Sequence, residues 1–142
     1  MAFTLADIRA ALKAQLVANL DRETNVYANP VLSPQPPSVT IWAADDYVDY
    51  WLSMGGNGLA AVRFTLELDP GAGDYESQSI RLDDYLSAGT GNNSSVIDAI
   101  HADRTLGDVV DDCVILTCEV TRDPLMARLP VEIRVRKVGA QT

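Results

Sequence analysis

Three pairs of adjacent aspartates are the residues best suited by type to do chemistry: Asp45–Asp46, Asp83–Asp84 and Asp111–Asp112. Carboxylates close together can bind a divalent cation or share one proton. Neighbouring side chains on a strand or helix point in different directions, however, so a site needs carboxylates from separate elements to converge. The spacing of an EF-hand loop is also absent from the sequence. We therefore expect these pairs on solvated faces and at turn ends, with no metal bound.

His101 is the only histidine, so a Ser-His-Asp triad would have to use it. The sequence has no GxSxG elbow to present a catalytic serine. His101 ends a predicted helix, where a protonated imidazole interacts favourably with the helix C-terminus. The sequence therefore predicts no catalytic residue and no cofactor. A small hydrolase that combines His101 with the aspartate pairs is the enzyme alternative.

The charge balance argues against two classes of partner, nucleic acid and anionic membranes. The 142 residues include 20 acidic and 11 basic side chains, a formal net charge of −9. Binding to nucleic acid needs clustered Lys and Arg to neutralise phosphates, and an anionic membrane surface needs the same. Asp7 and Arg9 interrupt the N-terminal sequence, which lacks the basic and apolar regions of a signal peptide. We therefore expect no sequence-specific nucleic-acid binding and no membrane association.

Periodic apolar residues predict three helices. The first covers residues 4–20, where apolar side chains recur every three or four positions and form one stripe. Its members are Leu5, Ile8, Leu12, Leu16 and Leu20. A second helix is predicted over residues 75–88, with Leu82 and Tyr85 on its inner side. A shorter third helix begins at Ser95, which caps it together with Asp98.

Five runs read as strands: 38–43, 46–54, 59–69, 109–121 and 128–138. In residues 59–69 apolar and polar side chains alternate, which predicts a half-buried strand. The apolar stretch from Cys113 to Cys118 predicts an interior strand with two buried free thiols, as suits a reducing cytoplasm. Trp42, Tyr47, Tyr50 and Trp51 are predicted to be core residues, with an interface as the alternative.

The order of these elements predicts the fold class. Residues 28–38 hold four prolines and no apolar period, so they form a stiff connector after the first helix. Consecutive hairpins make antiparallel pairs and leave the helices to cover one face. We predict one α+β domain over residues 1–142. It has a mixed, mostly antiparallel sheet of four to five strands, with the N-terminal helix and two central helices packed on it.

Several stretches resemble the tail terminator proteins of siphophages that infect actinobacteria. The N-terminal helix and the connector NPVLSPQPPSVTI are similar to the start of that family. The block YVDYWLSMGGNGLAAVRFTLEL follows, and then a helix that ends in LDDYLSAG. The phrase S-V-x-x-A-I-x-A-D-x-T-L-G, from Ser95 to Gly107, is similar to the family's most recognisable stretch. These residues are structural in type, and the resemblance covers nearly the whole chain in order.

The resemblance implies a mixed sheet flanked by helices and a hexameric ring. Such a ring stops growth of the tail tube, contacts the major tail tube protein and presents a surface to the neck or stopper protein. It would lie at the head-proximal end of the virion tail, after assembly in the host cytoplasm. The family has no catalytic activity and no cofactor. The Arg-rich C-terminal hairpin, DPLMARLPVEIRVRKV, departs from the blander strand expected there.

Two groups of charged residues are candidates for roles in such a ring. The polar sides of two predicted strands carry mixed charges that could set register between neighbouring subunits. These candidate interface residues are Arg63, Glu67, Glu132, Arg134 and Arg136. Asp45, Asp46 and Asp49 cluster near a predicted turn without basic neighbours and are candidates for the lumen wall. Another head–tail connector (stopper or adaptor) and an acidic inhibitor or immunity-type module are the non-enzymatic alternatives.

Overall fold

The computed structural model describes residues 5–20, 24–32, 35–49, 60–71, 73–87, 95–107, 110, 112–115, 117–122 and 125–135. Within these ranges it contains three helices: α1 (Leu5–Asn19), α2 (Tyr75–Leu86) and α3 (Val96–His101). The strands are β1 (Asn25–Tyr27), β2 (Ser38–Asp49), β3 (Ala60–Asp69), β4 (Asp112–Ile115), β5 (Glu119–Arg122) and β6 (Leu125–Val135). None of the described helices is long and apolar enough to cross a membrane.

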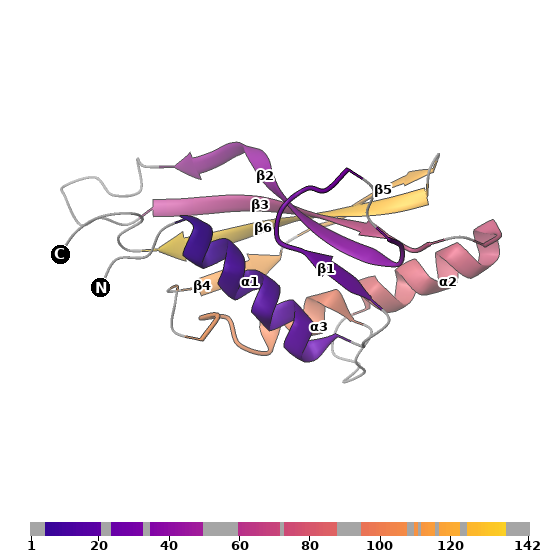
Figure 1. Ribbon diagram of the computed structural model, residues 1–142, viewed down its shortest axis with the longest axis horizontal. Coiled ribbons are helices and arrows are strands. Elements are labelled where there is room, and N and C mark those ends of the chain that lie inside the picture. The colour runs from indigo at the N-terminus through magenta and orange to yellow at the C-terminus, as the bar shows by residue number, and fades with distance from the viewer. Residues whose placement is uncertain are drawn as a thin grey trace.

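The strands form one mixed sheet in the order β1-β2-β3-β6-β4, with β5 also paired to β6 (Figure 1). Only the β1–β2 pair among them is parallel. Arg128 of β6 has one partner on β3 and another on β5, so β3 and β5 lie on opposite sides of β6. β4 pairs with β6 on the same side as β5. The predicted α+β class with a mostly antiparallel sheet is confirmed. The short strands β1 and β5 extend that sheet to six strands.

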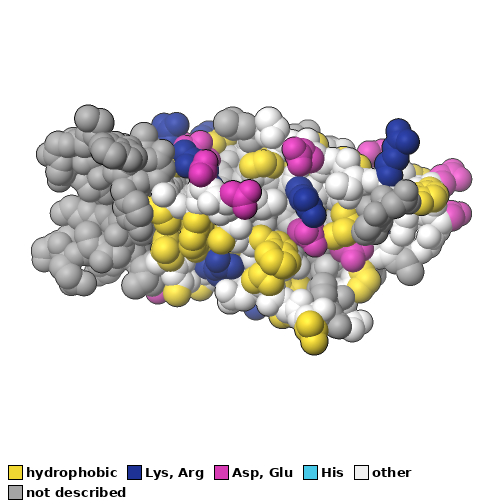
Figure 2. Space-filling model, turned by 90° about the horizontal axis from the view of Figure 1, so that it is seen from above, with side chains coloured by type: hydrophobic (Ala, Val, Ile, Leu, Met, Phe, Trp, Pro, Cys, Tyr) yellow, Lys and Arg dark blue, Asp and Glu magenta, His cyan; other side chains and the backbone are white. Residues whose placement is uncertain are grey.

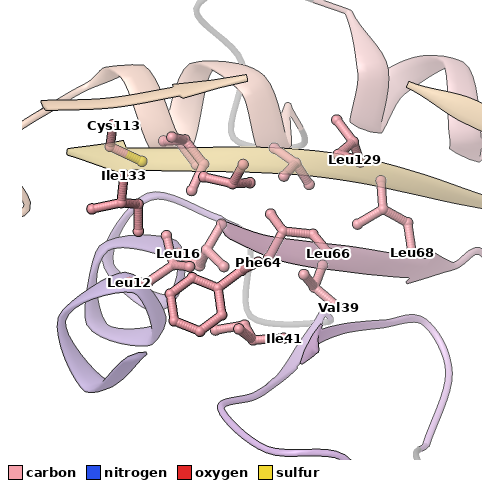
Figure 3. Close-up of a cluster of buried hydrophobic side chains, with 14 of the residues drawn as sticks. Leu12, Leu16, Val39, Ile41, Phe64, Leu66, Leu68, Cys113, Leu129 and Ile133 are labelled. Atoms are coloured by element: carbon pink, nitrogen blue, oxygen red, sulfur yellow. The ribbon is translucent and has the colours of Figure 1, made fainter. Parts of the chain in front are cut away.

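The core lies between the sheet and the helices. On β3 the side chains of Val62, Phe64, Leu66 and Leu68 are all fully buried, as their alternation predicts. Figure 3 shows Leu12 and Leu16 of α1 next to Phe64 and Ile41. Each fully buried side chain of this size stabilises the fold by about 1.5–3 kcal/mol. The predicted helical stripe is therefore confirmed as the face of α1 that covers the sheet.

α2 and α3 extend the same core and begin at defined caps. The carboxylate of Asp74 accepts a hydrogen bond from the Ser77 amide at 2.8 Å. The hydroxyl of Ser95 accepts one from the Asp98 amide at 3.1 Å, as predicted. Leu82 and Tyr85 of α2 and Val96, Ala99 and Ile100 of α3 belong to the one buried cluster that contains α1. All three helices thus cover one face of the sheet.

β2 differs from the sequence prediction. Residues 38–43 and 46–54 were expected as separate strands, with Asp45 and Asp46 at a turn. Instead β2 continues to Asp49, and its pairing with β3 shifts register between Ala43 and Val48. The extra residues are absorbed as a bulge, so pairing resumes beyond the polar Asp45–Asp46 sequence. Residues 50–54 lie outside the described part of the chain.

The prediction of an interior strand within residues 109–121 is wrong. The segment 109–121 contains two short strands, β4 and β5, and both lie at the edge of the sheet. Their registers against β6 differ by one residue, which is consistent with the interruption between them. Cys113 is buried, but Cys118 is exposed, so only one of the two predicted buried thiols is correct. Of the described residues in this apolar run only Cys113 is fully buried, so the run did not mark a strand with neighbours on both sides.

The connector between β1 and β2 is held at its base. The Asn25 amide donates to the Pro37 carbonyl at 2.9 Å, and the Asn25 side chain donates to the Gln35 carbonyl at 2.8 Å. The Gln35 amide donates to the Tyr27 hydroxyl at 3.0 Å. Farther along the connector Val31 is exposed, and Leu32 is fully exposed at 101%. We call these two residues the connector tip.

Candidate functional site

The outer face, which we define as the side of the sheet opposite the helices, carries the candidate interface residues. Alternation on β3 and β6 buries one set of side chains in the core and turns the other set outward. The outward set includes Arg63, Thr65 and Glu67 of β3, opposite Glu132, Pro130 and Arg128 of β6. Figure 2, viewed from the side away from the helices, shows acidic and basic side chains interspersed with hydrophobic patches.

Charged side chains on this face pair across the two strands. Arg63 lies 3.9 Å from Glu132, and Arg128 lies 3.7 Å from Glu67, between side-chain nitrogen and oxygen. Arg134 is also 3.9 Å from Glu132. Each exposed pair of this kind contributes about 0.2–1 kcal/mol. The Arg63–Glu132 and Arg128–Glu67 pairs favour the observed register of β3 against β6, whereas Arg134 and Glu132 lie on the same strand.

Four of the five candidate interface residues therefore meet on one face: Arg63, Glu67, Glu132 and Arg134. Their role between subunits stays a prediction, because the observed pairs are within the subunit. Arg136 lies outside the described residues. Arg128, which the sequence analysis missed, completes the Glu67 pair. The Glu67–Arg128 pair becomes evident only from the register of β3 against β6.

A neutral row separates these charged pairs. Trp42 on β2 lies opposite Thr65, and Thr65 lies opposite Pro130. Trp42 is 42% exposed, so its predicted place in the core is wrong, whereas Tyr47 is half-buried. Thr65 and Pro130 are short side chains between longer charged ones. The outer face is consequently hollowed along this row.

Two hollows open at the neutral row, and Pro130 lines both of them. The larger, of about 440 Å³, is lined by Trp42, Asp45, Glu67, Glu119 and Arg128 among others. We call it the acidic hollow, because three carboxylates face one guanidinium. The smaller, of about 260 Å³, is lined by Ala44, Val114, Pro130, Arg63 and Glu132 among others. We call it the neutral hollow, because one cation and one anion lie in its lining.

The candidate lumen residues are on β2. Asp45 and Asp46 are exposed within the bulged part of the strand, and Asp45 lines the acidic hollow. Asp49 is the last residue of β2, and its side chain lies outside the described set. The structure thus places the two described carboxylates at the surface. Whether they face a lumen stays a prediction.

His101 has a structural contact. Its Nε2 accepts a hydrogen bond from the Ile115 amide at 3.4 Å, which connects the end of α3 to β4. His101 is the last residue of α3, where the sequence predicts it. The contact joins two elements of the fold.

The described members of the aspartate pairs lie on separate elements and do not converge on one site. Asp83 and Asp84 are exposed on α2, and Asp112 forms two hydrogen bonds with Arg104 at 2.8 and 2.9 Å. Asp111 lies outside the described residues. Among the residues that are described, no group of three or more His, Cys, Asp or Glu side chains is placed to hold a metal ion.

The turn after α3 is organised by Asp103. Its carboxylate accepts hydrogen bonds from the Thr105 hydroxyl at 2.6 Å and from the amides of Thr105 and Gly107 at 3.0 Å. These bonds, with the Thr105 hydroxyl as the main cause, hold the pKa of Asp103 below its ordinary value of 3.8. Gly107 has a φ of 72°, in the left-handed region that glycine adopts without strain. The turn directs the chain toward β4.

Comparison with known proteins does not assign the chain to a family. No family model matches the chain, and no curated protein sequence gives a significant match. Functional inference therefore depends on the residues themselves, namely the stretch from Ser95 to Gly107 and the charged, hollowed outer face.

Proposed function

We propose that this protein is a ring-forming tail terminator of a siphophage tail. In this role six copies cap the tail tube, join it to the head–tail neck or stopper protein and leave a lumen for DNA. The protein is a structural part of the virion and not an enzyme. It is made in the host cytoplasm and ends at the head-proximal end of the tail.

The observation that carries the proposal is the stretch from Ser95 to Gly107, where the family resemblance is most specific. Most of the shared positions have a structural task in this chain. Ser95 caps α3, and Val96, Ala99 and Ile100 are buried. Asp103 and Thr105 build the following turn, which Gly107 completes. The residues that carry the resemblance are therefore structural in this chain, which supports an assembly role over a reactive centre.

The outer face adds physical support. A closed ring needs a heterologous interface, in which one patch of a subunit meets a different patch of the next. No described helix packs on the outer face, so this broad surface with paired charges and hollows is open to a neighbour. Interfaces of this kind combine a neutral centre with a charged rim. The neutral row between two sets of ion pairs has that arrangement.

The direct test uses purified protein with tail tubes polymerised from the major tail protein encoded beside this gene. We expect rings in native mass spectrometry or negative-stain images, on the free protein or at one end of each tube. Addition of the protein should also stop tube growth. A protein that stays monomeric at every concentration, with no ring on tubes, would contradict the proposal.

The same experiment separates the alternatives. A stopper or adaptor would bind other neck proteins and leave bare tubes free to grow. An acidic inhibitor would stay monomeric and bind a basic nuclease, a reading that the net charge of −9 keeps open. A terminator gene is expected immediately before the gene for the major tail protein, whereas the inhibitor reading predicts a nuclease gene nearby.

A further inference from the structure

The connector tip presents two apolar side chains to solvent. Leu32 is fully exposed and Val31 is 44% exposed. Prolines at Pro30, Pro36 and Pro37 fix their φ angles, and hydrogen bonds from Asn25 and Gln35 hold the base of the connector. A stiff segment loses little conformational freedom when it binds. The two adjacent exposed aliphatic side chains offer apolar surface that gains free energy when a partner removes it from water.

Charge restricts where two copies of this chain can touch. Each copy carries a formal charge of −9, so acidic surfaces repel one another at close range. Residues 24–44 contain no Asp, Glu, Lys or Arg, and the connector tip lies in the middle of this segment. A neighbour can therefore approach through the connector without bringing a charge into the contact. Burying an unpaired charge there would be costly.

The neutral hollow is the matching surface on the same molecule. Arg63 and Glu132 offset each other at its rim, and Ala44, Val114 and Pro130 give it apolar walls. Its volume of about 260 Å³ suits one or two aliphatic side chains. The acidic hollow is a poorer fit, because Asp45, Glu67 and Glu119 would surround the entering side chains with carboxylates.

We infer that the connector tip of one subunit, Val31 and Leu32, inserts into the neutral hollow on the outer face of the next subunit. The two patches are different, so the contact is heterologous and each subunit offers one of each. Repetition of such a contact gives a ring when the rotation closes. This inference rests on the proposed ring and names the surfaces that build it. The exposed hydrophobic side chains at both patches leave water when the ring forms.

Disulfide trapping tests this contact directly. In a Cys118→Ser background, Leu32→Cys and Ala44→Cys together should give a covalent ladder of chains after mild oxidation of the rings or ring-capped tubes. A 1:1 mixture of the two single variants should stop at covalent dimers, because each chain then has only half of the contact. The matched control pairs Ala44→Cys with Ile80→Cys, an exposed aliphatic site on α2, and should give no ladder.

A charge variant gives an independent readout. Leu32→Asp should leave the melting temperature of the subunit unchanged and raise the protein concentration needed for ring formation about tenfold or more. Ile80→Asp should leave both unchanged. Rings that form without the Leu32–Ala44 ladder, or that form normally with Leu32→Asp, would overturn this contact while leaving the ring intact. Absence of rings from the parent protein, both free and on tubes, would overturn the contact and the proposed function together.

Discussion

The guanidinium of Arg9 on α1 donates a hydrogen bond to the hydroxyl of Tyr47 on β2, across 3.3 Å. The same guanidinium donates to the backbone carbonyls of Ala28 and Ile41 at 2.9 and 3.0 Å. It also lies 5.1 Å from the centre of the Phe64 ring, which packs edge-on against Tyr47. One side chain of the N-terminal helix thus joins the connector, the bulged strand β2 and the core.

Arg9→Met should therefore destabilise the protein. The methionine keeps much of the apolar stem but leaves the carbonyls of Ala28 and Ile41 without this donor, a loss of about 1–3 kcal/mol. Chemical denaturation measures the free energy of unfolding. Lys13→Met, at an exposed position of the same helix, is the control and should change it by less than about 0.5 kcal/mol. Equal stability of the two variants would show that the Arg9 contacts contribute nothing.

Leu12→Ala should weaken the fold through the core. Leu12 is fully buried beneath the sheet, so its truncation removes packing and leaves a cavity, at a cost of about 2–5 kcal/mol. Val17→Ala is the matched control, because Val17 lies on the same helix and is 57% exposed. Thermal and denaturant unfolding should separate the two variants clearly. If Leu12→Ala unfolds like wild type, α1 does not cover the sheet as described.

Local patterns predicted the faces of the elements well. Alternation in β3 identified Phe64 and Leu66 as core residues, because one side of that strand is buried and the other is not. Alternation does not determine which residues of two neighbouring strands pair, however, because a slip of two residues keeps every side chain on its face. The pairs Arg63–Glu132 and Glu67–Arg128 therefore could not be deduced from the sequence.

The features that sequence reasoning missed depend on distant residues. The partners of Arg9 lie 19, 32 and 38 positions away, so no local spacing reveals them. The apolar run after Cys113 gave no sign that its strand lies at a sheet edge, because Cys113 is buried in the core while Val114 lines a hollow on the outer face. The two hollows also could not be predicted from the sequence. They arise where Thr65 and Pro130 become neighbours through the β3–β6 register.

The two cysteines should react very differently with a thiol reagent such as dithiobisnitrobenzoate. Cys118 is exposed, whereas burial, helped by the negative charge of Asp112, raises the pKa of the Cys113 thiol to about 12. The reactive species is the thiolate, so Cys113 should stay unmodified in the folded subunit. We expect one fast thiol per native chain, two in denaturant, and none in native Cys118→Ser. Fast modification of native Cys118→Ser would contradict the burial of Cys113.

Asp103 should make stability depend on pH in the acid range. Its pKa is lower in the folded chain than the ordinary 3.8, so its contribution is complete above that value. The contribution is lost as the pH falls through the lower folded pKa. The stability difference between wild type and Asp103→Asn should therefore be constant above about pH 5 and shrink below about pH 4. Urea unfolding over that range measures it, and a difference that does not change with pH would refute the role of the carboxylate.

The last prediction concerns the candidate lumen residues Asp45, Asp46 and Asp49. Asp45 and Asp46 are exposed on β2, and a ring of six copies would multiply the −9 charge of each chain around one channel. DNA is a dense line of phosphates, so a basic wall would hold it, whereas an acidic wall repels it within a Debye length of about 8 Å. Reversal of all three residues to Lys should leave folding and ring formation intact but slow DNA ejection.

Ejection from phage particles that carry the triple variant measures this effect, with salt as an internal control. Because the attraction is electrostatic, added salt should restore the ejection rate toward that of wild type. Asp83→Lys with Asp84→Lys, at exposed positions on α2, is a matched change of charge away from β2. Normal ejection by the triple-Lys ring would remove the lumen assignment and leave the ring proposal standing. Failure of the triple variant to form rings would instead place these carboxylates, with the nearby acidic hollow, in the subunit interface.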